Sequence, residues 1–99
     1  MIVMTVHMQA IPAKRRELLQ TLHELTEVMR KEKGFIDSQI CLDNESQQMV
    51  TFIEEWETQA DIESYTRSNY FSVLEGAMKL LTESSEIEFS MGGKPYENM

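Results

Sequence analysis

Residues 35–56 read FIDSQICLDNESQQMVTFIEEW, and this stretch decides the fold because it has the pattern of a β-hairpin. Two runs rich in β-branched and aromatic residues, Phe35 to Leu42 and Gln48 to Trp56, lie on either side of the polar segment Asp43-Asn44-Glu45-Ser46. Such runs joined by a short polar turn predict two antiparallel strands. Because side chains alternate along a strand, we expect one side of the first strand to carry three apolar residues: Ile36, Ile40 and Leu42.

The segment before the hairpin predicts a strand followed by a helix. Residues 2–10 alternate between apolar and other side chains, which is typical of a strand, with Ile2, Met4, Val6 and Met8 on one side. Pro12 suits the first turn of a helix, and Gly34 suits its C-terminal cap. Between them, apolar residues recur at steps of three and four and form one helical face: Leu18, Leu22, Leu25 and Met29.

The segment after the hairpin predicts helical structure and a last strand. Thr58 and Asp61 have the spacing of a helix N-cap, and a short helical turn follows to about Arg67. Ser68 is placed to cap a second helix, whose apolar stripe comprises Phe71, Leu74, Met78 and Leu81. Residues 84–91 alternate again and predict the final strand.

The element order is therefore β-α-β-β-α-β, which predicts a ferredoxin-like α+β fold with an antiparallel sheet and both helices on one face. We expect one domain over residues 1–99, with residues 91–99 as a tail that is flexible or ordered by a partner. The other face of such a sheet is bare. We therefore expect two copies to pack these faces together as a homodimer.

Charge and cysteine content narrow the classes of function. Nine Lys and Arg against seventeen Asp and Glu leave a net charge of −8, which repels nucleic acids and anionic membranes. The single cysteine, Cys41, cannot form an internal disulfide and is expected to be a small buried residue. Without a recognisable signal peptide or membrane span, the expected location is the cytoplasm.

Three short motifs resemble a known family. The segment Glu54-Glu55-Trp56-Glu57-Thr58-Gln59-Ala60-Asp61-Ile62 is similar to a recurring stretch of the antibiotic biosynthesis monooxygenase family. Ser68-Asn69-Tyr70-Phe71 falls where many members carry Ser-Pro-His-Phe, and Pro12-Ala13-Lys14 falls where they carry Pro-Gly-Lys. The resemblance implies a dimeric α/β barrel with one pocket per subunit between sheet and helices.

Members of that family include cofactor-free oxygenases of polyketides and quinols, haem-degrading enzymes and an isomerase, and this chain departs from their patterns in three places. Residues 70–81 contain no histidine for the haem iron. Phe52 stands where polyketide-oxidising relatives carry a polar residue, so a hydrogen bond to a substrate carbonyl is missing there. Tyr65 and Tyr70 stand in for two family histidines and still offer hydroxyl groups.

His7 is the candidate base, because a histidine is suited to proton transfer at neutral pH; the alternative is a half-buried histidine at the dimer face. Three interpretations of Trp56 stay open: its ring lines the pocket, its indole N–H donates a hydrogen bond there, or it only packs in the core between sheet and helix. Phe52, Tyr65, Asn69 and Tyr70 are candidate substrate-binding residues, with capping the helix as the alternative for Asn69. No metal site and no cofactor motif is recognisable.

By resemblance, the leading interpretation is a cofactor-independent monooxygenase that oxidises a quinol-like or phenolic small molecule with dioxygen. The residues permit this chemistry, which needs a mostly dry pocket, an aromatic wall and one proton acceptor. Two alternatives stay open: a non-catalytic dimer that binds a small apolar ligand, and an isomerase of a small carbonyl compound.

Overall fold

The computed structural model describes residues 1–91 and 94–95. Its strands are β1 (Ile2–Ala10), β2 (Phe35–Leu42), β3 (Met49–Trp56), β4 (Thr82–Met91) and the short β5 (Lys94–Pro95). Its helices are α1 (Arg15–Met29), preceded by a single 3₁₀ turn (Pro12–Lys14), then α2 (Gln59–Thr66) and α3 (Asn69–Leu81). Every strand and helix of the sequence analysis is present, and the expected short helical turn is α2.

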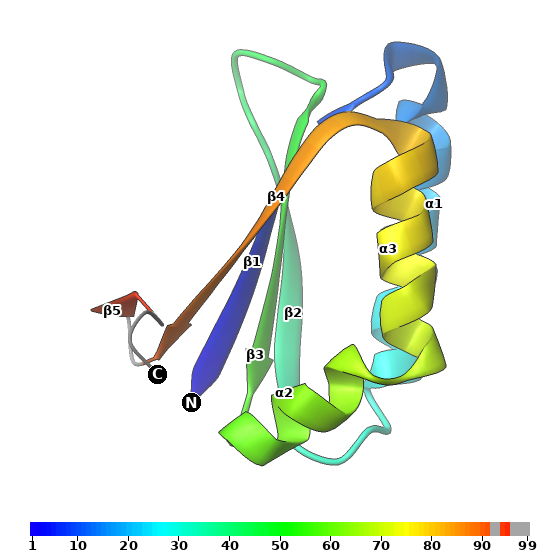
Figure 1. Ribbon diagram of the computed structural model, residues 1–99. Helices are drawn as coiled ribbons and strands as arrows, with labels where there is room; N and C mark the ends of the chain where they lie inside the picture. Colours follow the sequence, from blue (N-terminus) through cyan, green and yellow to red (C-terminus); the bar gives the residue numbers. More distant parts are fainter. Residues whose placement is uncertain (92–93, 96–99) are drawn as a thin grey trace.

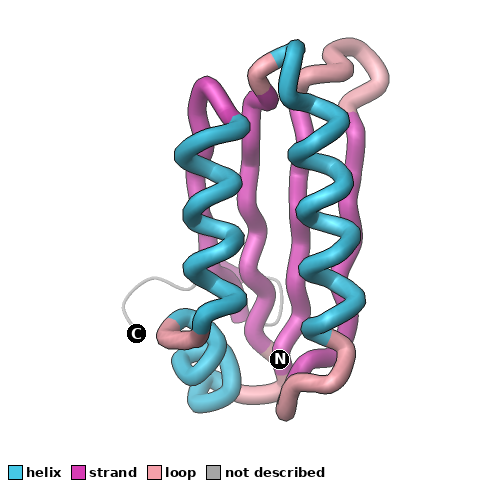
Figure 2. Tube along the Cα trace, turned by 90° about the vertical axis from the view of Figure 1, so that its right-hand side faces the viewer, coloured by secondary structure: helices cyan, strands magenta, loops and turns pink. Residues whose placement is uncertain are grey.

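The strands form one antiparallel sheet in the order β2-β3-β1-β4-β5. The three helices lie on one side of it, and the other side is bare (Figure 1). Seen from the helical side, α1 and α3 run side by side along the strands, while α2 closes one end of the layer (Figure 2). The α+β ferredoxin-like fold is thus confirmed.

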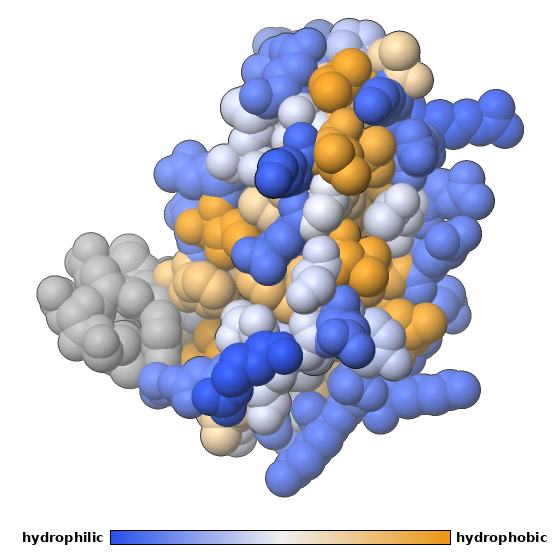
Figure 3. Space-filling model, turned by 45° about the vertical axis from the view of Figure 1, so that its right-hand side comes forward, coloured by the Kyte–Doolittle hydropathy of each residue, from blue (hydrophilic) through white to orange (hydrophobic). Residues whose placement is uncertain are grey.

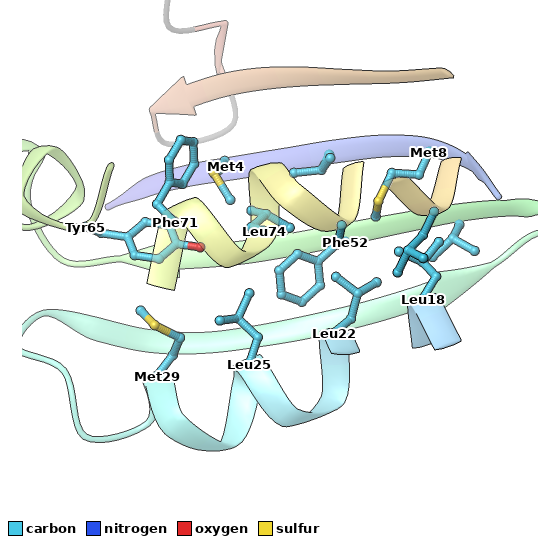
Figure 4. Packing of buried hydrophobic residues seen from close by; sticks show 14 of the residues in the cluster. Met4, Met8, Leu18, Leu22, Leu25, Met29, Phe52, Tyr65, Phe71 and Leu74 are labelled. Carbon is cyan, nitrogen blue, oxygen red and sulfur yellow. The ribbon is translucent and has the colours of Figure 1, made fainter. Parts of the chain in front are cut away.

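The core lies between the sheet and the helices (Figure 4). Alternate residues of β1 and β3 are buried in it, and their neighbours face the other way. The predicted helical stripes of α1 and α3 are also confirmed, since Leu18, Leu22, Leu25, Met29, Phe71, Leu74 and Leu81 are buried and Met78 is partly so. On the helical side of the surface, apolar patches are separated by charged side chains (Figure 3).

The edge strand β2 departs from expectation. Ile36 is 44% exposed and Leu42 is 48% exposed, and only Ile40 of the three packs against the core. The register with β3 shifts between Phe35 and Asp37, so Ile36 falls at an irregularity where simple alternation does not hold. Cys41 is exposed, which corrects the expectation of a buried thiol. An edge strand has a neighbour on one side only, so its side chains are less covered.

Two further expectations concern the chain's end and membranes. Of the predicted tail, Met91 belongs to β4 and Lys94–Pro95 pairs with that strand; residues 92–93 and 96–99 lie outside the described residues. Among the described residues, no helix has the length and apolar character needed to cross a membrane.

Gly34 closes the connection between α1 and β2 with a φ of +84°, a conformation that favours glycine. A Cβ atom at this position would lie 2.2 Å from the Cγ atom of Asp61 in α2. The carbonyl of Gly34 also accepts a hydrogen bond of 2.8 Å from the backbone N–H of Glu57. Glycine at this position therefore lets the connection approach α2 closely.

We expect Gly34→Ala to lower the free energy of unfolding by about 2 kcal/mol, because it adds both backbone strain and a clash with Asp61. Gly76→Ala is the matched control. A Cβ there meets nothing within 4 Å, so the helix should gain up to about 1 kcal/mol. Urea denaturation measures both variants. Equal effects of the two substitutions would contradict this account.

Candidate functional site

A buried carboxyl group lies at the centre of the candidate site. In β3, Phe52, Glu54 and Trp56 share the face that is turned toward the helices. Glu54 is 0% exposed, although it is an acidic residue in an otherwise apolar layer. A buried charge is costly unless it has hydrogen-bond partners.

Two aromatic side chains supply these partners. The indole N–H of Trp56 donates to Oε1 of Glu54 over 3.3 Å, and the hydroxyl of Tyr65 donates to Oε2 over 3.1 Å. Trp56 comes from the same strand as Glu54, whereas Tyr65 comes from α2. Each carboxylate oxygen thus receives one hydrogen bond.

The surroundings shift the protonation of this cluster. Burial raises the pKa of Glu54 to about 7, although the hydrogen bonds from Trp56 and Tyr65 act in the opposite direction. Burial, followed by the nearby Glu54 charge, also raises the pKa of Tyr65. At neutral pH, Glu54 can therefore accept or release a proton, while Tyr65 does not ionise on its own and can give up its proton only as it receives another.

The two donors also stack on each other. The rings of Trp56 and Tyr65 lie 4.8 Å apart at an interplanar angle of 25°. Phe35 meets Trp56 edge-on, and Phe71 meets Tyr65 in the same way. Figure 4 shows Tyr65 and Phe71 at one end of the layer between the sheet and the helices. Packing on several sides holds the donors in place.

A cavity of about 220 Å³ borders this cluster. Trp56 and Tyr65 form its aromatic wall, and the remaining lining residues are polar or small: Glu32, Lys33, Ala60, Asp61, Ser64 and Ser68. The start of α2 is held by its cap, in which the hydroxyl of Thr58 accepts from the backbone N–H of Asp61. This cap fixes where α2 begins, and the helix then lies at the end of the sheet, beside the cavity (Figure 2).

The structure brings two of the predicted site residues together, Trp56 and Tyr65. Phe52 lies on the same face but is fully buried in the core. Tyr70 lines a different hollow of about 470 Å³, and Asn69 is exposed at the start of α3, where Ser68 provides the cap. The indole N–H of Trp56 is engaged by Glu54, so Trp56 offers the cavity its ring.

His7 lies on the opposite, bare face of the sheet, because its neighbours Val6 and Met8 are the buried residues of β1. Its Nε2 atom is 2.6 Å from Oε1 of Glu88 on β4. It also lines a separate hollow with Gln9, Ser84 and Glu86, among others. Within one chain, the sheet therefore separates His7 from the cavity beside Trp56.

Glu54 is a candidate site residue that the sequence analysis did not single out. The available signal was its position between Phe52 and Trp56, because residues two apart in a strand share a face. Within the described part of the chain, no group of three or more histidine, cysteine, aspartate or glutamate side chains is arranged to hold a metal ion.

Comparison with known proteins points to one family. A family model described as antibiotic biosynthesis monooxygenase matches residues 1–75. A search of curated protein sequences gives no significant match.

Solved structures share the fold at low sequence identity. A conserved protein from Methanosarcina mazei has a TM-score of 0.82 at 24% identity, over 90% of this chain and 89% of its own. A Deinococcus radiodurans protein, provisionally named an antibiotic biosynthesis monooxygenase, has a TM-score of 0.83 at 15% identity, over 100% and 99% of the two chains. A third structure, named an antibiotic biosynthesis monooxygenase, has a TM-score of 0.79 at 18% identity, over 92% and 97%.

We expect Glu54→Gln to remove a pH-dependent loss of stability. In the unfolded chain the carboxyl ionises near its ordinary value of 4.5, whereas in the fold its pKa is about 7. Between these values the folded state holds the extra proton, so wild-type stability falls as the pH rises through this window, by up to about 3 kcal/mol. Glutamine does not ionise; its amide oxygen can still accept from the Trp56 N–H, while its NH₂ group donates to the Tyr65 oxygen in place of the bond that Tyr65 donates to Glu54.

Urea unfolding at several values between pH 5 and pH 8 measures this difference. The free energy of unfolding of Glu54→Gln should rise relative to wild type as the pH increases. Glu55→Gln, on the opposite face of the same strand, should follow wild type. A constant difference between Glu54→Gln and wild type across this range would contradict a raised pKa for Glu54.

Proposed function

Because the chain belongs to the antibiotic biosynthesis monooxygenase family, we propose that it oxidises a phenolic or quinol-like small molecule with dioxygen and without a cofactor. The observation that supports this most is the buried Glu54 carboxyl beside a cavity with an aromatic wall. Such an oxygenation needs a proton acceptor that works at neutral pH, a site for a planar ring and little water.

Glu54 is the proposed base, in place of His7. Burial brings the pKa of Glu54 to about 7, so an ionised fraction is available at neutral pH. Glu54 does not itself line the cavity, but Tyr65 belongs to both the cavity wall and the hydrogen-bond cluster. The substrate hydroxyl donates to the Tyr65 oxygen, while Tyr65 passes its own proton to Glu54.

Trp56 and Tyr65 provide the wall against which the ring of the substrate packs. The cavity of about 220 Å³ is somewhat larger than an apolar cavity of ~150 Å³ that holds benzene. It therefore suits a substrate of one or two fused rings better than a larger polycyclic compound. The Ser64 hydroxyl, which also lines the cavity, is available to its oxygen atoms, whereas the Ser68 hydroxyl is engaged in capping α3.

The reaction balances without an added reductant. The phenolate formed by proton loss gives one electron to dioxygen, and the resulting phenoxyl radical and superoxide join at a ring carbon that carries hydrogen. Glu54 returns its proton to the peroxide. Loss of the ring C–H proton then breaks the O–O bond, releases water and leaves a carbonyl. One phenol and one dioxygen thus give one quinone and one water.

The assembly that we propose is a homodimer through the bare face of the sheet. Residues in the middle of this face are uncharged and partly buried, namely Val3, Thr5, Thr51 and Ile53. A second copy would cover them, as the helices cover the other face. In that arrangement the His7–Glu88 pair belongs to the dimer face.

Oxygen uptake in the presence of one- and two-ring quinols and phenols tests the activity, with protein that has been treated with a chelator. We expect turnover, and we expect Glu54→Gln to lower kcat/KM about 100-fold, the usual contribution of a general base. Glu55→Gln is the matched control and should retain wild-type rates. A comparable loss in His7→Ala alone would place the base on the other face.

If no compound supports uptake above its spontaneous rate, the oxygenase proposal is wrong. A ligand that raises the melting temperature without turnover would then favour the non-catalytic binding protein.

Sedimentation velocity at micromolar concentration tests the assembly. We expect a dimer, and we expect Ile53→Lys to give a monomer, because it places a charge in the middle of the bare face. Val73→Lys is the control, since Val73 is exposed on α3 in the helical layer. A wild-type protein that sediments as a monomer would rule out the proposed dimer.

A further inference from the structure

The buried Glu54 poses a question about its proton. Both of its hydrogen-bond partners donate to it, and an indole N–H cannot accept a proton in return. Trp56 is 1% exposed and Tyr65 is 3% exposed, and both border the cavity, so on that side a proton can reach Glu54 only through the Tyr65 hydroxyl. A carboxyl group that gains and loses a proton near neutral pH needs a path to water.

Ser38 lies directly opposite Glu54 in the register of β2 and β3. Both side chains point toward the helices, because Ser38 bonds to α1 and Glu54 bonds to α2. Side chains that are directly opposite in an antiparallel pair have Cβ atoms about 5 Å apart. In the described part of the chain the Glu54 carboxyl bonds to Trp56 and Tyr65 and not to Ser38, so a transfer to Ser38 requires the carboxyl to turn toward β2. On the other side of Glu54, the residue opposite on β1 is Met4, which offers no hydroxyl.

The path continues from Ser38 to α1. The hydroxyl oxygens of Ser38 and Thr26 are 2.8 Å apart, and either can be the donor. Thr26 is 8% exposed, and Ser38 is only partly buried because β2 is the outer strand of the sheet. This hydroxyl pair therefore connects the strand next to Glu54 with the outer edge of the sheet without passing through the cavity wall. Tyr65 is the one titratable side chain among the described hydrogen-bond partners of Glu54.

We propose that the Ser38–Thr26 hydroxyl pair is the route by which Glu54 exchanges its proton with solvent. A hydroxyl both donates and accepts, so the pair can pass a proton in either direction by reorienting its hydrogen bonds. The route lets Glu54 exchange its proton with solvent at the edge of the sheet, away from the cavity. It stays open when a ligand occupies the space beside Trp56 and Tyr65.

The protein contains a built-in probe for this exchange. Trp56 is the single tryptophan of the chain, and its indole N–H donates to Glu54. The ¹H–¹⁵N spectrum of the wild-type protein should therefore show one indole peak that moves with the protonation of Glu54. In phosphate buffer, exchange through the hydroxyl pair should keep this peak single and averaged throughout a pH titration.

The test uses two pairs of variants that differ by a hydroxyl group. Ser38→Ala and Thr26→Val remove it, and we expect the averaged indole peak to broaden or split into two near the midpoint of the titration. Ser38→Thr and Thr26→Ser keep it, and we expect a single averaged peak. A structural effect alone would not separate the variants by the presence of the hydroxyl.

A single averaged peak in both Ser38→Ala and Thr26→Val would overturn the route. So would splitting that occurs only in Tyr65→Phe, because the proton would then pass through the cavity wall. Neither result depends on turnover. The oxygenase proposal and the proton route can therefore fail separately.

Discussion

The register between β1, β3 and β2 is the constraint on which the rest of the structure depends. Side chains alternate strictly between the two faces of a sheet, so a slip of one residue exchanges the face of every side chain in a strand. With the observed pairing, Phe52, Glu54 and Trp56 all face the helices. A shift by one would place Glu55 in the core and turn Glu54 toward the bare face, and the polar cluster would be lost.

A buried carboxyl is an expensive feature for a chain of 99 residues, because a small domain has little stability to spare. Glu54 lies in the core, where an apolar side chain would fit the pattern of its neighbours. Burial raises the pKa of its carboxyl group to about 7. Residues that reduce stability in this way are typical of functional sites. The hydrogen bonds from Trp56 and Tyr65 offset part of the cost and fix both carboxylate oxygens.

The ferredoxin-like fold accounts for the shape of the site but not for its chemistry. The similar solved structures share the fold at 24% identity or less, and one fold supports many activities. The candidate site in this chain combines a buried carboxyl, two stacked aromatic rings and a cavity of about 220 Å³. The cavity and the proposed dimer interface lie on opposite faces of the sheet. The cavity needs the helices, whereas the proposed dimer uses the surface that carries His7.

The sequence by itself determined the order of the elements, the side of β1 and β3 that is buried, and the helical stripes, because these follow from local periodicity. It also singled out Trp56 and Tyr65. Only the tertiary structure decided that these two meet, because Tyr65 is nine residues further along and its position depends on how closely α2 approaches the chain at Gly34. The same holds for Glu54. Its inward direction follows from alternation, but its raised pKa and its partners arise from residues that folding brings together around it.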